Sequence, residues 1–470
     1  MTDILVLDQG GQSSRACLFS PAGEKIASSK VAIKTRRYDN LFVEHDADEL
    51  IESLLQASQD VLKSCSDECV SGLATQRSSI VCWDTETGQP LTPVISWQDR
   101  RAYQWMQQFQ SQKKQIYQAS GLFPTAYYGA SKIKWCLSNV PDVVNAYQNQ
   151  TLCCGSLASY IIFKLTKERQ CLCDAVNASR TLLCDVKSLS WSSYLLKLFG
   201  IDDRVLPKIV PNHYSYGILA IDGFNIPLTL VTGDQSSALF GFGQIKANTL
   251  AINMGTGVFI QRPIPSLKLN DDSQLLISPI LQNNKKSSYV IEGTVNGGAS
   301  AIASMDELLS IQQSELEKLT FPVNDSDKIP LFINGVGGVG SPYWLPNIKS
   351  QFIGEGTGRQ KMIAVLESIA FLIKKNIDSM AEISAVSEKA FISGGLSNNA
   401  YLVGALMQLT GLRLCQSMDH ELTIKGIAYL ITGKECFTSI PNEIPSVVKD
   451  AGLLQRYHYW EKQMGLLVAE

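Results

Sequence analysis

The sequence has no excess of charge of either sign and no long apolar run. Among its 470 residues, 41 Lys and Arg stand against 44 Asp and Glu, so the net charge is -3. Because such a chain offers a polyanion no general basic surface, we predict no nucleic-acid partner. No apolar stretch approaches the roughly 18 residues that indicate a membrane-spanning helix, and the segment after Met1 has no basic signal-peptide flank. We therefore expect no membrane insertion and a cytoplasmic location.

Metal-binding patterns of Cys and His are also missing. The chain has four His and twelve Cys, and ten of the cysteines precede residue 185. No two cysteines have the CxxC spacing, and no Cys/His set has the spacing of a zinc site. We expect most of the cysteines to be small buried residues in a reducing compartment.

Strand-like and helix-like segments alternate along the chain, which predicts an α/β fold. An apolar run at 4–7 ends in a polar, Gly-rich turn at 8–14, and the apolar character resumes at 15–19. The same pattern returns at 250–260, where the turn is 255–257. This echo of one strand pair indicates two lobes of related design. We predict that they comprise residues 1–244 and 245–470.

Helices are predicted where apolar residues recur at three- and four-residue spacing, over 48–62, 360–380 and 399–409. Asn398 and Asn399 stand where a helix N-cap would, directly after a strand-like segment and the turn Gly394-Gly395. The sequence therefore places a glycine turn at a helix entrance.

Three Gly-rich turns, at 8–14, 255–257 and 394–395, are candidates for binding phosphate. Wrapping a phosphate in backbone N–H groups needs close approach of the main chain, which glycine allows. Each turn leaves a strand, although a single turn of this kind is more often an ordinary loop.

Other nucleotide-binding motifs do not fit. The chain has no GxxxxGK[ST] motif. Residues 335–340 match GxGxxG, but the two prolines that follow do not suit the helix of a dinucleotide site, and we interpret this segment as a loop near a ligand.

Asp8 and Asp234 each follow an apolar strand and sit in a turn of small residues. A carboxylate at a strand end can hold Mg²⁺ through water, or accept the proton of an attacking hydroxyl. The alternative is an Asp that forms a turn or caps a helix, which is the more common role over all proteins. For Asp234 a helical pattern at 236–240 follows.

The segment 97–101, Trp-Gln-Asp-Arg-Arg, concentrates an aromatic face, an amide, a carboxylate and two guanidinium groups. Polyol and sugar sites stack the carbon skeleton on an aromatic ring and bind the hydroxyls with planar polar side chains. A solvated helix start with a half-buried Trp is an equally good interpretation of this segment alone.

Taken in order, these motifs resemble the FGGY family of carbohydrate kinases over essentially the whole chain, and most of all its glycerol-phosphorylating members. The matching segments are Asp8-Gln9-Gly10, Ser13-Ser14-Arg15-Ala16, Val43-Glu44-His45-Asp46, Gln76-Arg77, Trp83-Asp84, Thr87-Gly88, Trp97-Gln98-Asp99-Arg100-Arg101, Asp174, Asn177-Ala178-Ser179-Arg180-Thr181, Gly233-Asp234-Gln235, Ala238-Leu239-Phe240-Gly241, Gly255-Thr256-Gly257, Pro342-Tyr343-Trp344, Leu366-Glu367-Ser368-Ile369-Ala370, Gly394-Gly395 and Asn398-Asn399.

The resemblance implies a two-lobed actin/hexokinase-like (ribonuclease H-like) fold with the active site in the cleft between the lobes. It implies an ATP- and Mg²⁺-dependent kinase, with Asp234 as general base and Asp8 orienting the metal. It places the polyol among Arg77, Ser78, Trp97, Tyr127, Asp234, Gln235 and Phe259. It places ATP against Gly10, Gly11, Gln12, Ser13, Gly255, Thr256, Gly394, Gly395 and Asn399. The 1–244 lobe would be the substrate and metal side, and the 245–470 lobe the nucleotide side.

Two positions depart from the pattern of the glycerol-phosphorylating members. Gly11-Gln12 stands where those proteins usually have Thr-Thr, and Ser78 stands where they have a Glu that contacts glycerol. Losing such a charge-assisted acceptor costs roughly 1.5–3 kcal/mol if nothing replaces it. A ketose or pentulose kinase, or a catalytically weak polyol- and ATP-binding protein, therefore remains an alternative.

The sequence also bears on regulation and assembly. Residues 220–227 lack the loop with which many bacterial members bind a sugar bisphosphate inhibitor, so we expect no such regulation. Whether the protein forms a homo-oligomer is left open.

Overall fold

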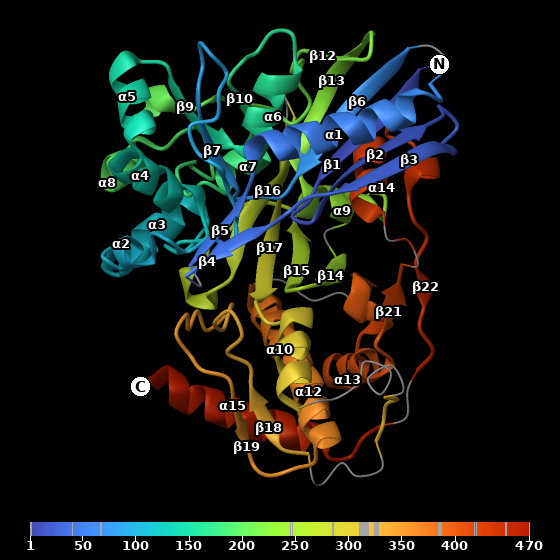
Figure 1. The fold of residues 1–470 in the computed structure, drawn as a ribbon. Coiled ribbons are helices and arrows are strands. Elements are labelled where there is room, and N and C mark those ends of the chain that lie inside the picture. Colours follow the sequence, from blue (N-terminus) through green and yellow to red (C-terminus); the bar gives the residue numbers. More distant parts are fainter. Residues whose placement is uncertain are drawn as a thin grey trace. The chain divides into compact units, whose positions relative to one another are not determined.

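A computed structural model describes residues 2–39, 41–65, 68–244, 246, 248–283, 286–309, 319–323, 329–383, 388–417, 419, 421–446 and 449–469. The chain divides into two compact units (Figure 1). The first unit comprises Met1–Ile245, Ile277–Tyr289 and Glu421–Ser439, and the second comprises Lys246–Leu276, Val290–His420 and Ile440–Glu470. The predicted division at 244/245, and the roles given to the two sides, stay predictions.

A six-stranded sheet forms the centre of the first unit, with the order β12-β13-β6-β1-β2-β3. Strand β1 pairs with β6 in parallel and with β2 antiparallel, and β13 also runs parallel to β6. The carboxyl ends of β1, β6 and β13 therefore meet at one edge of the sheet. The bounds are β1 (Asp3–Gln9), β2 (Ser13–Phe19), β3 (Lys25–Ala32), β6 (Cys69–Thr75), β12 (Ile218–Ile221) and β13 (Phe224–Gly233).

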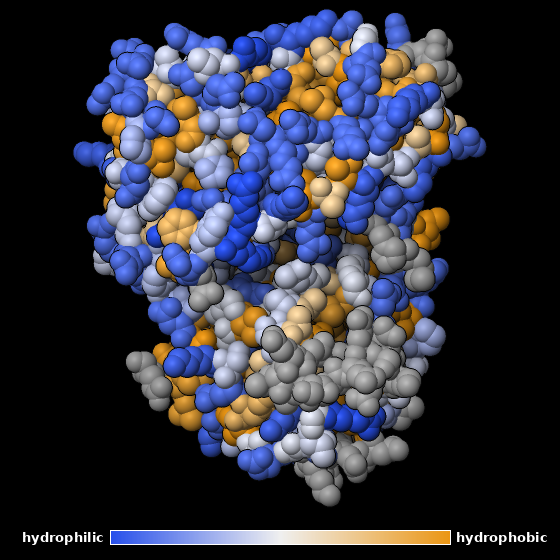
Figure 2. Space-filling model, in the orientation of Figure 1, coloured by the Kyte–Doolittle hydropathy of each residue, from blue (hydrophilic) through white to orange (hydrophobic). Residues whose placement is uncertain are grey.

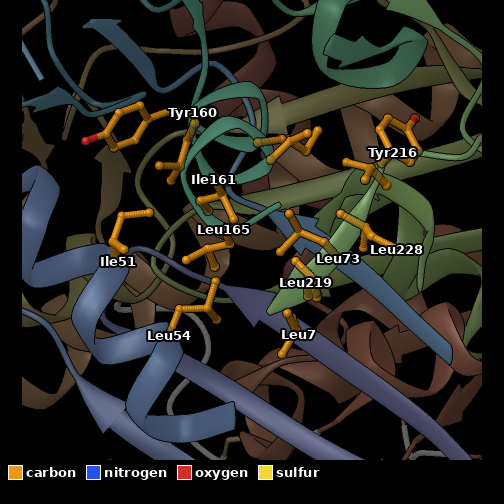
Figure 3. Packing of buried hydrophobic residues seen from close by; sticks show 14 of the residues in the cluster. Leu7, Ile51, Leu54, Leu73, Tyr160, Ile161, Leu165, Tyr216, Leu219 and Leu228 are labelled. Atoms are coloured by element: carbon orange, nitrogen blue, oxygen red, sulfur yellow. The ribbon is translucent and has the colours of Figure 1, made fainter. Parts of the chain in front are cut away.

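Strand β1 is apolar without interruption because helices cover both faces of this sheet. Leu5 and Leu7 belong to a core that includes residues of α1 (Ala47–Leu62), whereas Ile4 and Val6 pack with residues of α14 (Leu422–Thr432). Figure 3 shows Leu7 close to residues of α1 and of α6 (Leu157–Leu165). Each fully buried Leu stabilises the fold by about 1.5–3 kcal/mol relative to an exposed one. The core thus fixes β1, and with it Asp8.

The first unit also contains a five-stranded sheet of order β4-β5-β8-β7-β9, and a two-stranded sheet of β10 and β11. Their bounds are β4 (Arg36–Tyr38), β5 (Phe42–His45), β7 (Ile80–Asp84), β8 (Val94–Ile95), β9 (Leu152–Ser156), β10 (Leu172–Asp174) and β11 (Lys208–Val210). The other helices of this unit are α2 (Tyr103–Gln107), α3 (Lys113–Ser120), α4 (Gly129–Asn139), α5 (Pro141–Asn149), α7 (Ala175–Ser179), α8 (Ser193–Phe199) and α9 (Asp234–Phe240).

The second unit is built on a sheet of order β16-β17-β15-β14-β20-β21-β22, of which parts of β16 and β17 are assigned to the first unit. The bounds are β14 (Leu250–Met254), β15 (Val258–Ile264), β16 (Leu276–Gln282), β17 (Ser287–Val295), β20 (Lys389–Ser393), β21 (Arg413–Gln416) and β22 (Asn442–Glu443). A small sheet pairs β18 (Leu331–Ile333) with β19 (Gln351–Ile353), and the helices are α10 (Ala299–Leu309), α12 (Gly358–Ile383), α13 (Ala400–Thr410) and α15 (Leu453–Ala469).

These elements confirm the α/β prediction and the predicted repeat. The antiparallel pair β14–β15, with β20 parallel to β14, repeats the arrangement of β1, β2 and β6. The helices predicted over 48–62, 360–380 and 399–409 are α1, α12 and α13. Their bounds differ from the predicted ones by at most three residues, close to the usual uncertainty of helix ends.

The described surface is mainly polar, as Figure 2 shows for the face in view of the first unit. No helix in the described ranges is long and apolar enough to cross a membrane.

All twelve cysteines are free, and only Cys436 is exposed. Cysteine in this chain thus acts mainly as a small packing residue, as its distribution predicts.

Candidate active site

Asp8 and Asp234 lie at neighbouring strand ends of the first unit. In the sheet register, Asp8 is opposite Ala74 of β6, and Ala74 is opposite Thr232 of β13, two residues before Asp234. Burial and the negative charge of Asp234 raise the pKa of Asp8, Arg15 lowers it, and the result is a pKa of about 7. The two carboxyl groups, which are 226 positions apart in sequence, therefore interact in one site.

Asp234 is the first residue of α9, and Gly233 occupies the N-cap position. Its side chain therefore is not the N-cap of this helix. The Asp234 Oδ1 accepts a hydrogen bond from the Gln235 backbone N–H at 2.7 Å. The carboxylate is thus held at the helix entrance, next to the end of β13, while its side chain stays partly exposed.

Helix α14 supports α9 through unusually close packing. A β-carbon added to Gly426 would lie 1.9 Å from the Ser237 carbonyl oxygen, so only glycine fits. The Ser237 hydroxyl donates to the Thr423 carbonyl at 2.7 Å. The helix that carries Asp234 is therefore fixed by a segment almost 190 residues downstream.

The loop between β6 and β7 brings Arg77 and Ser78 to the same edge. Its start is held by the Gln76 backbone N–H, which donates to the Gln9 carbonyl at 2.8 Å. The Arg77 stem passes over Gly233, where an added β-carbon would be 2.6 Å from the Arg77 Cγ and Cδ. Ser78 is buried and has a positive φ of 65°, which is uncommon for a residue with a side chain. Two of the predicted substrate residues thus adjoin the carboxylate pair.

Residues 10–12 form the tight turn between β1 and β2, in which the Gly10 N–H donates to the Ser13 carbonyl at 3.1 Å. A β-carbon at Gly10 or Gly11 would make only ordinary contacts, of 3.5 Å and 3.7 Å. The protein's own packing therefore does not require glycine at either position. Gln12 is exposed and Ser13 is buried.

The segment 97–101 divides into a structural part and a part near the predicted pocket. Arg101 binds Asp99 and Glu44, at 2.8 and 2.5 Å, and its guanidinium lies over the ring of Phe42. Arg100, by contrast, hydrogen-bonds to Tyr127, whose pKa is raised by burial and lowered by this contact. The carboxylate and one guanidinium of the predicted sugar-binding set are therefore committed to the fold.

Trp97 is held in the same region. Its backbone N–H donates to the Ser79 hydroxyl at 3.0 Å, and that hydroxyl donates to the Gln76 Oε1 at 3.1 Å. Trp97 is thus connected to the loop that carries Arg77 and Ser78.

In the second unit, the turns 255–257 and 394–395 meet at one edge of the sheet. Strands β14 and β20 are parallel, and a β-carbon on Gly394, whose φ is +88°, would lie 2.5 Å from the Met254 carbonyl oxygen. Gly394 is thus required by the fold, whereas a β-carbon on Gly395 would meet nothing within 4 Å. Thr256 at the tip of the other turn is exposed.

Asn399 and Phe259 are the remaining predicted site residues, and both belong to the second unit. The Asn399 Oδ1 caps α13 by accepting from the Leu402 N–H at 2.9 Å, as predicted for a helix entrance. Phe259 is on β15, next to the turn 255–257, and is partly exposed. The loop at 335–340 is followed by turns and not by a helix over residues 341–350, in agreement with its rejection as a dinucleotide site.

Several buried polar atoms near the carboxylate pair make no hydrogen bond within the described structure. They are the Thr75 Oγ1, Thr232 Oγ1, Gln235 Oε1 and Ser236 Oγ. Buried polar atoms are normally hydrogen-bonded, so these four atoms point to a polar ligand or water at this edge.

No group of three or more His, Cys, Asp or Glu among the described residues could hold a metal ion. A pair of carboxylates remains, which suits Mg²⁺ because this ion usually also takes water and substrate phosphates as ligands.

Sequence reasoning gave no role in this region to Arg15 or Lys132, and it did not predict the contact made by Arg100, which belongs to the predicted sugar-binding segment 97–101. Arg15 acts on the Asp8 carboxyl, Arg100 binds Tyr127, and the fully buried Lys132 of α4 binds the carbonyl oxygens of Ser78 and Tyr127. Arg15 and Arg100 lie in motifs that the sequence had singled out. Lys132 had no such signal, because a lysine in a helical pattern is expected to face solvent.

Solved structures with a similar fold define the class of protein. The structure of Plasmodium falciparum glycerol kinase with ADP superimposes with a TM-score of 0.88 at 24% identity, covering 99% of this chain and 98% of that one. The structure of a ligand-bound xylulose kinase from Lactobacillus acidophilus gives 0.83 at 18% identity, covering 99% and 97%. The fold is therefore the α/β fold shared by these glycerol and xylulose kinases.

Sequence comparison identifies the family. Residues 3–241 match the N-terminal domain, and residues 250–432 the C-terminal domain, of the FGGY family of carbohydrate kinases. The glycerol kinase of Shewanella oneidensis is 33% identical over 450 residues, covering 91% of this chain and 89% of that protein. The chain belongs to the FGGY family of carbohydrate kinases and is an ATP-dependent kinase.

Proposed function

We propose that the protein transfers the γ-phosphoryl group of ATP to a hydroxyl of glycerol or of a related polyol or sugar. The observation that carries this proposal is the pairing of Asp8 with Asp234 at the ends of parallel strands, where burial and Asp234 together raise the pKa of Asp8 to about 7. Phosphoryl transfer requires in-line placement, neutralisation of oxygen charge and a nearby proton acceptor. Two interacting carboxylates can divide the last two tasks.

Asp234 is the proposed general base. It begins α9, is partly exposed, and can accept a hydrogen bond from an acceptor hydroxyl placed beside it. As the phosphorus–oxygen bond forms, the hydroxyl proton passes to Asp234, and the bond from phosphorus to the leaving oxygen of ADP breaks.

Asp8 is the proposed metal residue. Its burial makes an ionised carboxylate costly unless a cation is present, and Asp234 adds to that cost. Bound Mg²⁺ would supply positive charge for the phosphate oxygens. Arg15, which is opposite Asp8 on the adjacent strand β2, lowers the pKa of Asp8 and so already offsets part of this cost.

The glycine turns are the proposed contacts to ATP. A β-carbon would make only ordinary contacts at Gly10 and Gly11 and would meet nothing within 4 Å at Gly395, so the fold itself does not need glycine at these positions. Exposed Thr256 can donate its hydroxyl to a phosphate, and Gly255 its backbone N–H. Gln12, Ser13, Gly394 and Asn399 complete the proposed nucleotide set, with Asn399 offering its side-chain amide nitrogen.

The proposed acceptor pocket comprises Arg77, Ser78, Trp97, Tyr127, Asp234, Gln235 and Phe259. Six of these residues belong to the first unit, in which Arg77 packs over Gly233 at the end of β13 and Trp97 is hydrogen-bonded to Ser79 of the same loop. Arg77 and Gln235 offer hydrogen bonds to hydroxyls, and the rings of Trp97 and Tyr127 offer apolar faces to carbon atoms.

Ser78 supports a second candidate, a ketose or pentulose kinase. Its short side chain leaves no carboxylate for the hydroxyls of glycerol and gives more room for a longer acceptor. Phosphorylation of pentuloses in preference to glycerol would favour this candidate, and the Ser78→Glu variant should then shift the preference toward glycerol.

The test is ADP release by the purified protein with ATP and Mg²⁺, measured separately with glycerol, longer polyols and pentuloses against a blank without acceptor. Turnover above the blank with one class identifies the acceptor. Binding of ATP and a polyol without transfer would contradict the proposal and identify a catalytically weak binding protein.

A further inference from the structure

Lys132 is a fully buried cationic residue on the first turn of α4, with 1% of its surface exposed. Its Nζ donates a hydrogen bond to the Ser78 carbonyl oxygen at 3.2 Å and a second, shorter one to the Tyr127 carbonyl oxygen. These two acceptors belong to loops separated by about 50 residues in the sequence. A buried lysine whose partners are both main-chain carbonyls ties two backbone segments together.

We propose that Lys132 is a positioning residue, which sets the acceptor pocket by clamping the Ser78 loop to the Tyr127 turn. The inference rests on the proposed function only in that Ser78 and Tyr127 are taken to line the acceptor pocket. The clamp itself is a property of the fold and can be measured without a substrate.

The Ser78 backbone is the part that needs such a clamp. A φ of 65° is unfavourable for a residue with a β-carbon, so the conformation persists only if its surroundings hold it. The Lys132 hydrogen bond holds the carbonyl of this same residue. Without it, Ser78 should relax toward negative φ and turn the adjacent peptide units.

Such a rotation would reach the rest of the pocket. The preceding residue, Arg77, packs its stem over Gly233 beside Asp234. The following residue, Ser79, binds the Trp97 backbone N–H through its hydroxyl. Lys132 therefore acts on acceptor contacts that it does not itself touch.

The charge state of Lys132 does not alter this role. Burial lowers the pKa of Lys132 to about 7, with Asp99 raising it and Arg101 lowering it. The ammonium form has three N–H groups and the amine form has two, so either form can serve both carbonyls.

Ser131 offers a matched control on the same helical turn. It is also fully buried, and its hydroxyl donates to the Ala126 and Tyr128 carbonyls, each at 3.0 Å. Ser131→Ala therefore loosens the Tyr127 turn without touching Ser78. Lys134→Met is a second control, because Lys134 binds the Gly200 carbonyl at the surface.

The experiment compares Lys132→Met, Lys132→Arg and the two controls by steady-state kinetics and by hydrogen exchange. For Lys132→Met we expect the KM for the acceptor to rise about tenfold or more, with the KM for ATP within twofold of wild type and partial recovery in Lys132→Arg. Amide exchange should increase in both 76–79 and 126–128 for Lys132→Met, but only in 126–128 for Ser131→Ala.

Equal changes of KM in Lys132→Met and Ser131→Ala would overturn the proposal, because general loosening of α4 would then explain both. Unchanged exchange at 76–79 in Lys132→Met would also overturn it. Should Lys132→Met not fold, Lys132→Gln takes its place with the same expected pattern, because its side chain is one bond shorter and cannot donate to both carbonyls as Nζ does. A wild-type protein that phosphorylates no acceptor would refute the proposed function alone, since the exchange pattern still decides the clamp.

Discussion

Arg77 lies across the backbone of Gly233, directly before Asp234. A β-carbon at position 233 would be 2.6 Å from the Arg77 Cγ and Cδ, and Arg77 is itself buried. Since Gly233 has φ −86° and ψ 149°, an alanine would cause no backbone strain there, and its effect would be purely steric. Gly233→Ala should therefore displace Arg77 and lower kcat/KM for the acceptor by about tenfold or more.

Kinetics with varied acceptor and varied ATP check this prediction, with Gly465→Ala as the control. Gly465 is an exposed residue of α15 where an added β-carbon meets nothing within 4 Å. The control should gain roughly 0.5–1 kcal/mol of stability and keep its activity. Wild-type acceptor kinetics in Gly233→Ala would mean that Arg77 does not contact the acceptor.

Replacing Asp234 by Asn tests the general base. The substitution keeps the size of the side chain and removes the proton acceptor, so kcat should fall by about 10²- to 10⁴-fold. Nucleotide affinity, measured by titration calorimetry with ATP, should stay close to wild type, because no proposed nucleotide contact is lost. An Asn variant with wild-type turnover would remove Asp234 from the chemistry.

The buried Asp8 should make the metal-free protein less stable as the pH rises. Its folded-state pKa of about 7 lies above the ordinary value of 3.8, so between these values the folded state keeps a proton that the unfolded state has released. The free energy of unfolding therefore falls as pH rises through this window. Above pH 7 the buried carboxylate costs on the order of a few kcal/mol.

Asp8→Asn should consequently be more stable than wild type at pH 8 in EDTA, and much closer to it at pH 4.5. Thermal unfolding of both proteins at the two pH values checks this expectation. Adding Mg²⁺ with ATP should stabilise wild type more than the variant. A variant that is less stable than wild type at both pH values would show that the Asp8 carboxylate is stabilising without a metal.

Much of this site could be predicted because its parts are local. The run at 4–7 is apolar at every position, which indicates a strand covered on both faces, and Asp8 follows it directly. The Gly turns and Asp234 were found in the same way, each from the strand that precedes it.

The contacts that arrange those parts depend on tertiary packing and left no signal in the sequence. Helix α14 has an ordinary helical pattern, and nothing in it shows that Gly426 packs on Ser237 in the first unit. The positive φ of Ser78 could not be predicted, because a serine in the sequence does not indicate this conformation as a glycine would. In the segment 97–101, side-chain type could not show which arginine the fold itself uses.

In the second unit, Arg456 of α15 forms buried ion pairs with Glu367 of α12 and with Asp450. Its Nε and Nη2 donate to the Glu367 carboxylate at 2.8 and 2.5 Å, and Nη2 also reaches Asp450 at 3.0 Å. The Tyr401 hydroxyl donates to the same carboxylate at 2.7 Å. Because Glu367 would remain buried without its partner, Arg456→Met should cost about 3–5 kcal/mol.

The size of this loss should depend on pH. Burial raises the pKa of Glu367 and Arg456 lowers it, so removing Arg456 raises this pKa further and lets Glu367 hold a proton in mildly acid solution. Arg456→Met should therefore lose less stability at pH 5.5 than at pH 8 in urea unfolding.

Lys375→Met is the matched control, since Lys375 joins the same helices α12 and α15 through Glu461 at 2.9 Å, with about a third of each side chain exposed. This exposed pair should contribute less than about 1 kcal/mol at both pH values. Equal losses in the two variants would mean that the Glu367 carboxylate is solvated in the folded protein.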